Sequence, residues 1–191
     1  MSRRTLVLAS QSPRRVELMR EAGYDFEVLP VDVTEAHDES LSPEALTTAN
    51  ATLKAVAGAV LRPDAVVIGA DTLVYLDHLP LGKPRDLEEA ASMLRRLSGR
   101  AHHVCTGVSL ASEGGARVQR FAVISHVVFK TLTDADIAAY YAMVNPLDKA
   151  GAYAIQEHGE RIIECTEGSW TNIMGLPMER LREELETGLD G

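Results

Sequence analysis

A hexapeptide rich in hydroxyl and guanidinium groups follows the first short apolar run, residues 6–9. It contains Ser10, Ser12, Arg14 and Arg15. Ser12 is placed to cap a helix that would begin at Pro13. Arginines in a first turn oppose the helix dipole, and a bound anion would reverse that effect. Amides, hydroxyls and guanidinium groups together would form a cradle for a triphosphate.

The same hexapeptide has a plainer interpretation. Arg14 could pair with Glu17 at helical spacing, with both arginines on a solvated face, which is common and nearly neutral in energy. The hexapeptide alone does not separate the two interpretations.

A second candidate is Asp71, which directly follows the apolar run 66–70 and precedes Thr72. A carboxylate at the end of a buried strand is costly unless it is paired, hydrogen-bonded or facing a cleft. Strand ends are also where α/β proteins place their sites. Asp71 is therefore a candidate general base or metal ligand; the alternative is a turn aspartate that caps its own backbone.

Other candidates become notable only together. Glu35 lies in an acidic connection, Lys54 in an amphipathic stretch at 43–61, and Lys83 in a loop; each could be an ordinary solvated charge. In the small-residue segment 148–156, Lys149 could reach a phosphate and Gln156 could bond a base edge. The alternative for that segment is a tight connection with an exposed glutamine.

The elements that must position these residues indicate an α/β fold, because short apolar runs alternate with amphipathic segments. Helices are expected over 87–97, with a capping box of Asp86 and Glu89 and Gly99 beyond the end, and over 134–144. Apolar runs at 104–111 and 121–129 flank a glycine-bearing turn, which predicts an antiparallel hairpin and a mixed sheet. No repeat or proline-rich linker divides the chain, so we expect one domain over residues 1–191. Any two lobes would share a continuous sheet, and a cleft between them would be the default place for a ligand.

The composition argues against several kinds of function and binding site. The net charge of −9 argues against broad binding to nucleic acid or to anionic membranes. The cysteines and histidines lack metal-ligand spacing, so zinc is not expected. The run at 6–9 is too short for a signal peptide, and no stretch could span a bilayer. A cytoplasmic location is therefore expected.

Six segments in order and spacing resemble the Maf family. The match runs from about residue 5 to about residue 181, and one segment alone would be weak. The segments are Leu8-Ala9-Ser10-Gln11-Ser12-Pro13-Arg14-Arg15, Gly69-Ala70-Asp71-Thr72, Gly82-Lys83-Pro84-Arg85-Asp86, Leu97-Ser98-Gly99, Thr106-Gly107-Val108 and Asp148-Lys149-Ala150-Gly151-Ala152-Tyr153.

The resemblance implies an elongated α/β fold, with a mixed twisted sheet flanked by helices and two lobes around a central cleft. It also implies a homodimer and a nucleoside triphosphate pyrophosphatase that depends on a divalent cation, Mg²⁺ or Mn²⁺. It implies that Asp71 is the proton acceptor and that Arg14, Thr72 and Gln156 influence substrate choice. Positions that contact phosphate or metal match Ser10, Arg15, Glu35, Lys54 and Lys83, and Lys149 matches a further cleft lysine. Asp71 and Glu35 are the expected metal ligands.

Within the family, Asp71-Thr72 and the segment 149–156 resemble the branch that acts on dTTP and UTP. Departures from the family pattern occur at Thr34, at Asn50 and Thr52, and at Glu157-His158. Two alternatives stay open: a nucleotide-binding regulator of cell division, and a house-cleaning pyrophosphatase for 7-methyl-GTP or purine nucleotides.

Overall fold

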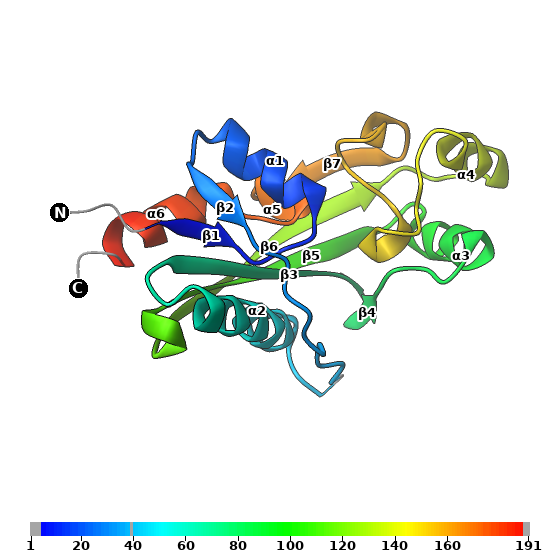
Figure 1. Ribbon diagram of the computed structural model, residues 1–191. Coiled ribbons are helices and arrows are strands. Elements are labelled where there is room, and N and C mark those ends of the chain that lie inside the picture. Colours follow the sequence, from blue (N-terminus) through cyan, green and yellow to red (C-terminus); the bar gives the residue numbers. More distant parts are fainter. Residues whose placement is uncertain (1–4, 39, 189–191) are drawn as a thin grey trace.

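The computed structural model describes residues 5–38 and 40–188, and its centre is a seven-stranded mixed sheet (Figure 1). The strand order is β2-β1-β3-β5-β6-β7, with β4 paired to β3. Neighbours of β1 are parallel to it, and all other pairs are antiparallel. The expected mixed α/β fold is confirmed. The strands are β1 (Leu6–Leu8), β2 (Phe26–Val28), β3 (Val66–Leu76), β4 (Leu79–Leu81), β5 (Ala101–Ser112), β6 (Arg117–Phe129) and β7 (Ile163–Glu167).

Helices cover both faces of this sheet. The long helix α2 packs on one face, where alanine and valine side chains form a small core. On the other face, α1, α5 and α6 lie toward one end of the sheet and α3 and α4 toward the other (Figure 1), each group over its own apolar cluster. The helices are α1 (Pro13–Glu21), α2 (Pro43–Leu61), α3 (Leu87–Leu97), α4 (Asp134–Tyr141), α5 (Trp170–Met174) and α6 (Met178–Gly188).

The central strand β3 has one edge that is only partly paired. β1 pairs with Val66 to Ile68, and β4 pairs with Val74 to Leu76. None of the described residues forms a strand beside 69–73 on that edge. Asp71 was expected at a strand end, and this was wrong, because β5 pairs along β3 as far as Tyr75. The carboxylate instead lies where β1 has ended, so it borders an opening in the sheet.

The approach of α2 to the sheet depends on two glycines. A Cβ at Gly69 would lie 2.2 Å from the carbonyl oxygen of Ala51, and one at Gly107 would lie 2.3 Å from the carbonyl carbon of Thr47. Only glycine fits there, because real Cβ atoms do not come so close to backbone. The close approach places the middle turns of α2 over Asp71.

Helix and turn details differ in part from the sequence expectations. Ser12 occupies the N-cap of α1 but its side chain makes no capping bond; Ser10 Oγ accepts from the Ser12 amide instead. The capping box of α3 was wrong: Asp86 accepts from the Glu89 amide, but the Glu89 carboxylate accepts from the amide of Arg85. α4 ends at Tyr141 rather than at 144.

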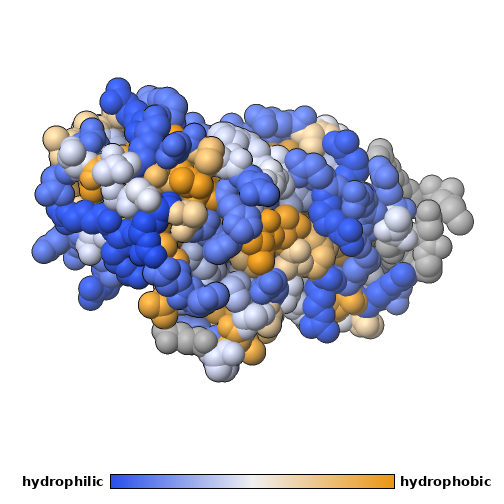
Figure 2. Space-filling model, turned by 180° about the vertical axis from the view of Figure 1, so that it is seen from behind, coloured by the Kyte–Doolittle hydropathy of each residue, from blue (hydrophilic) through white to orange (hydrophobic). Residues whose placement is uncertain are grey.

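The hairpin of β5 and β6 is confirmed, with a short 3-10 turn between the strands. Gly99 adopts the expected left-handed conformation, with φ of 67°. Seen from behind, the surface is largely hydrophilic, with hydrophobic side chains gathered in smaller areas (Figure 2). Among the described residues, no helix combines the length and the apolarity that crossing a membrane requires.

Candidate active site

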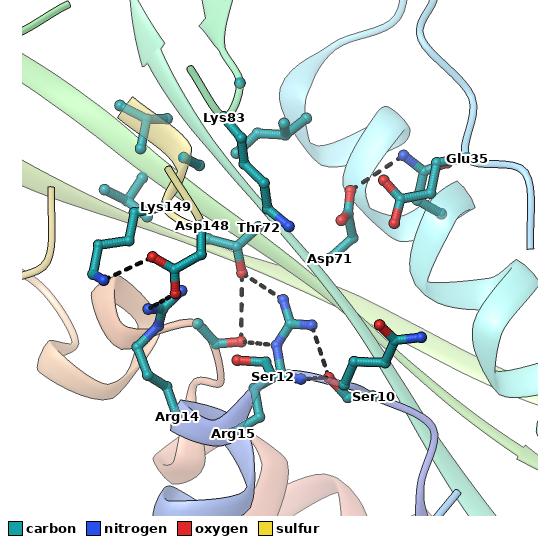
Figure 3. Close-up of a pocket in the computed structure, with 18 of the residues that line it drawn as sticks. Ser10, Ser12, Arg14, Arg15, Glu35, Asp71, Thr72, Lys83, Asp148 and Lys149 are labelled. Atoms are coloured by element: carbon teal, nitrogen blue, oxygen red, sulfur yellow. Dashed lines mark hydrogen bonds and ion pairs between the residues drawn. The ribbon is translucent and has the colours of Figure 1, made fainter. Parts of the chain in front are cut away.

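The open stretch of β3 borders a cleft of about 820 Å³, a size typical of small-molecule sites. It receives side chains from segments far apart in the sequence, among them the start of α1, α2, β3 and the segment 148–156 (Figure 3). Every residue singled out in the sequence lines it: Ser10, Arg14, Arg15, Glu35, Lys54, Asp71, Thr72, Lys83, Lys149 and Gln156.

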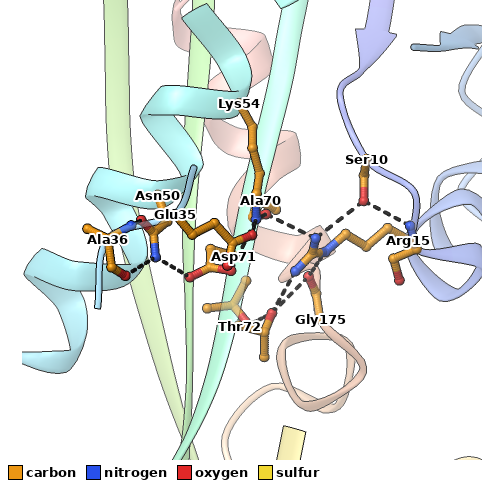
Figure 4. A network of polar contacts seen from close by, with 12 residues as sticks. Ser10, Arg15, Glu35, Ala36, Asn50, Lys54, Ala70, Asp71, Thr72 and Gly175 are labelled. Carbon is orange, nitrogen blue, oxygen red and sulfur yellow. Dashed lines mark hydrogen bonds and ion pairs between the residues drawn. The ribbon is translucent and has the colours of Figure 1, made fainter. Parts of the chain in front are cut away.

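Two carboxylates and a lysine meet at one end of this cleft. Lys54 Nζ lies 2.7 Å from Glu35 Oε1 and 3.1 Å from Asp71 Oδ1, and it also donates to the carbonyl of Ala70 at 3.2 Å (Figure 4). The Asp71 side chain is only 10% exposed. A nearly buried carboxylate of this kind needs a cation, and Lys54 on α2 supplies it. Asp71 is therefore not a turn aspartate that caps its own backbone.

Asn50 is a site residue that the sequence analysis noted only as a departure from the family pattern. Its amide nitrogen donates to Asp71 Oδ2 and to the carbonyl of Ala36, both at 3.2 Å, and its amide oxygen accepts from the Ala36 amide at 2.8 Å (Figure 4). It thus fixes Asp71 and the loop after Glu35 at once. The available signal was its position one helical turn before Lys54, on the same face of α2.

The guanidinium group of Arg15 joins three parts of the site. It donates to the carbonyls of Gly175 at 2.7 Å and of Ala70 at 3.0 Å, to Thr72 Oγ1 at 3.0 Å and to Ser10 Oγ at 3.3 Å (Figure 4). Burial lowers the pKa of Arg15, while the charge of Asp71 opposes that change. An arginine remains charged regardless, so Arg15 holds the loop before α1, strand β3 and the end of α5 around a fixed positive charge.

Thr72 extends this network across the sheet. Its hydroxyl lies 2.9 Å from that of Thr106 on β5, and the Thr106 hydroxyl donates to the carbonyl of Asn172 on α5 at 3.1 Å. The Thr72 side chain thus lines the cleft and is bonded on the face of the sheet that α5 covers.

A second charged cluster lies at the opposite side of the cleft. Asp148 contacts Arg14 Nη1 at 3.6 Å and Lys149 Nζ at 2.8 Å, so Arg14 pairs with Asp148 and not with Glu17. Partial burial opposes ionisation of Asp148, but the hydrogen bond from Lys149 and the charges of Lys149 and Arg14 outweigh it and lower the pKa of Asp148. In the sequence, Asp148 is notable only as part of a motif.

Lys83 and Gln156 are among the polar side chains of the cleft that have no partner in the described part of the protein. Within residues 5–38 and 40–188, neither the ammonium of Lys83 nor the amide of Gln156 makes a hydrogen bond or ion pair, although both line the cleft. Lys83 extends toward Thr72 and Asp71 (Figure 3). These groups are free to meet a ligand without first breaking an internal contact.

The carboxylates of Glu35 and Asp71 are groups of the cleft that could bind a metal ion. Within the described ranges, no three or more His, Cys, Asp or Glu side chains are grouped so that they could hold a metal ion by themselves. Two carboxylates are a poor zinc site, but they suit Mg²⁺, which takes one or two carboxylates and completes its shell with phosphate oxygens and water. The residues present therefore fit a magnesium-type ion that arrives with a phosphate ligand.

Comparison with known proteins places this cleft in a family. A family model described as "Maf-like protein" matches residues 5–188. A protein of Akkermansia muciniphila named dTTP/UTP pyrophosphatase is 50% identical over 173 residues, covering 91% of this chain and 90% of that one. Proteins of the same name from Desulfitobacterium hafniense and Xanthomonas euvesicatoria pv. vesicatoria are 44% and 46% identical, covering 96% and 91% of this chain and 85% and 93% of theirs.

Among solved structures, a HAM1 protein from Coxiella burnetii aligns with a TM-score of 0.46 and 19% identity, over 66% of this chain and 73% of that chain. The match of residues 5–188 to the family model covers nearly the whole chain and includes every cleft residue described above. Together with relatives up to 50% identical, it shows that this chain belongs to the Maf family.

Proposed function

We propose that this protein hydrolyses dTTP and UTP to the nucleoside monophosphate and pyrophosphate. The observation that carries the proposal is the contact of Asp71 with Lys54 and Asn50 at the edge of a cleft that also contains Lys83, Arg14 and Gln156. The names of the relatives, dTTP/UTP pyrophosphatase, support the choice of substrate.

The chemical step requires a base close to the α-phosphate. Asp71 uses one lone pair on each oxygen, for Lys54 and for Asn50, and a carboxylate has about four such sites. In the proposed reaction Asp71 accepts a proton from water as the water oxygen bonds to the α-phosphorus. The bond from the α-phosphorus to the bridging oxygen breaks, and pyrophosphate leaves.

The charge on the leaving pyrophosphate must be neutralised. Lys83, which has no internal partner among the described residues, would bind phosphate oxygens directly, and Arg15 would contribute a fixed positive field. Glu35 and Asp71 would hold Mg²⁺ or Mn²⁺ together with phosphate oxygens, and when bound such an ion neutralises phosphate charge.

Selection of the base would fall to Gln156, whose amide offers both a donor and an acceptor to a pyrimidine edge. A base that leaves the amide unpaired is penalised, which is how a site built from hydrogen bonds discriminates. A homodimer, a cytoplasmic location and the absence of a nucleic-acid partner stay predictions from the sequence.

The substitution Asp71→Asn tests the assigned base. It removes the proton acceptor but keeps the size of the side chain, so we expect turnover of dTTP to fall by about 10²–10⁴-fold while calorimetry still detects nucleotide binding. Asp64→Asn is the matched control, since Asp64 is exposed and precedes the first residue of β3. Near wild-type turnover in Asp71→Asn would show that the base is assigned to the wrong residue.

A further inference from the structure

We infer that Lys149 is a positioning residue that fixes the base-selecting side of the cleft, and that it does not bind phosphate. The inference rests on the proposed function and differs from the sequence-based prediction that Lys149 reaches a phosphate. It concerns the segment 145–157, which runs along the cleft and ends with Gln156 and Glu157.

The ammonium group of Lys149 is already occupied. It donates to the carbonyl of Asn145 at 2.8 Å and to Asp148 Oδ1 at 2.8 Å, and it lies 3.3 Å from Glu157 Oε2. Three acceptors match the three protons of an ammonium group. The Lys149 side chain is 5% exposed, so a phosphate would have to displace one of these three acceptors to reach its ammonium group.

These contacts join the two ends of the segment. Asn145 and Asp148 precede the small-residue turn, and Glu157 follows Gln156 by one position. Lys149 therefore links the chain before the turn to the chain after it. The same carboxylate that Lys149 holds, Asp148, is the only described partner of Arg14 (Figure 3), so the orientation of Arg14 also depends on Lys149.

The turn needs such an anchor because its backbone is strained. Ala152 has φ of 63°, a left-handed conformation that costs a residue with a Cβ free energy. Gly151 has φ of 70°, and a Cβ there would lie 3.1 Å from methyl groups of Val74. Strain of this kind persists only where the surroundings determine the conformation.

Aromatic side chains hold the other side of the same segment. Tyr140 Oη donates to the carbonyl of Ala154 at 3.2 Å and accepts from its amide at 3.1 Å, and Tyr141 Oη donates to the carbonyl of Ala152 at 3.1 Å. Lys149 supplies the fixation on the cleft side. Without it, Gln156 and Arg14 would lose their fixed relation to each other, and base selection would decline before phosphate binding does.

The test uses a variant that leaves the net charge of the cleft unchanged. In Lys149→Met with Glu157→Gln, one positive and one negative charge disappear together, so a loss of binding cannot be ascribed to altered long-range attraction. Lys130→Met is the control, because Lys130 is an exposed lysine outside the cleft. Glu157→Gln alone removes one contact at a half-exposed carboxylate and remains informative if the double variant does not fold.

Two quantities are measured: the affinity for inorganic tripolyphosphate, which has no base, and the ratio of kcat/KM for UTP to that for CTP. We expect tripolyphosphate affinity to stay within about threefold and the UTP-to-CTP ratio to fall about tenfold, because hydrogen-bond readout of the base is lost. Glu157→Gln should lower the ratio by a smaller factor.

A direct phosphate contact would give the opposite pattern. Loss of a charged hydrogen bond would weaken tripolyphosphate binding by about tenfold or more, with the UTP-to-CTP ratio unchanged, and that result would overturn the inference. Wild-type protein that releases no pyrophosphate from any nucleotide would refute the proposed function instead, and the tripolyphosphate titration would still report on Lys149.

Discussion

At the scale of single residues, the cleft is built from charged groups that restrain one another. Lys54 neutralises Glu35 and Asp71 on one side, and Lys149 neutralises Asp148 and Glu157 on the other. Lys83 differs, since among the described residues its ammonium meets no acceptor. A triphosphate would therefore find the internally paired charges already in place and one unpaired lysine available for binding, which is the preorganised arrangement that favours electrostatic catalysis.

Asn50 is expected to matter for activity because it bonds both Asp71 and the loop that carries Glu35. Asn50→Ala should lower kcat for dTTP by about 10–100-fold, since misplacement of a catalytic group by 1 Å has an effect of that order. Steady-state kinetics measure it. Thr48→Ala, a partly exposed position on the same helix whose hydroxyl donates to helix carbonyls, serves as the control. Equal kcat in the two variants would contradict the positioning role.

At the scale of elements, the close packing of α2 on the sheet carries Lys54 and Asn50 to Asp71. Gly107→Ala would bring a Cβ to 2.3 Å from the backbone of Thr47, so α2 must move away. We expect the free energy of unfolding to fall by about 3 kcal/mol or more, at the upper end of what overpacking costs. Urea denaturation measures this loss.

Gly82→Ala is the comparison for that experiment, because a Cβ at Gly82 meets no atom within 4 Å. Its free energy of unfolding should stay within about 0.5 kcal/mol of the wild-type value. A Gly107→Ala protein as stable as Gly82→Ala would show that α2 does not depend on this close approach.

The sequence predicted α3, the start of α1, most of α4 and the hairpin of β5 and β6, and the residues it singled out all line the cleft, because apolar periodicity, caps and family motifs are local signals. It did not predict that β3 continues through Asp71, since that depends on where β1 ends and β4 begins to pair. It also did not predict the contacts of Asn50 and Asp148, which join residues that are distant in the chain or lie on different elements. Such contacts are set by packing and leave no periodic signal.

At the scale of the whole molecule, the stability of the fold is expected to depend on pH through one buried histidine. His102 on β5 is fully buried beside Phe129 and Tyr153, and its Nε2 lies 2.8 Å from Tyr153 Oη. Burial, with a smaller effect of His103, lowers the pKa of His102 from 6.5 to about 3. The folded protein therefore holds this histidine neutral.

The direction in which the free energy of unfolding changes with pH follows from proton uptake by His102. Between pH 6.5 and about 3 the unfolded chain protonates His102 and the folded chain does not, so acid favours unfolding by up to about 1.4 kcal/mol per pH unit. His102→Phe removes this contribution. The difference in free energy of unfolding between wild type and His102→Phe should be constant above pH 7 and should shift in favour of the variant as the pH falls from 6.5 to 4. A difference that is independent of pH would contradict the assignment.

Release of pyrophosphate is the direct measure of the proposed reaction. The purified protein is incubated with dTTP, UTP, CTP, ITP and 7-methyl-GTP, in Mg²⁺ or Mn²⁺ and with a chelator as control. We expect more pyrophosphate and monophosphate from dTTP and UTP than from the other nucleotides, and none when the chelator is present. Release chiefly from 7-methyl-GTP or ITP would contradict the assigned substrates, and no release from any nucleotide would contradict the assigned reaction.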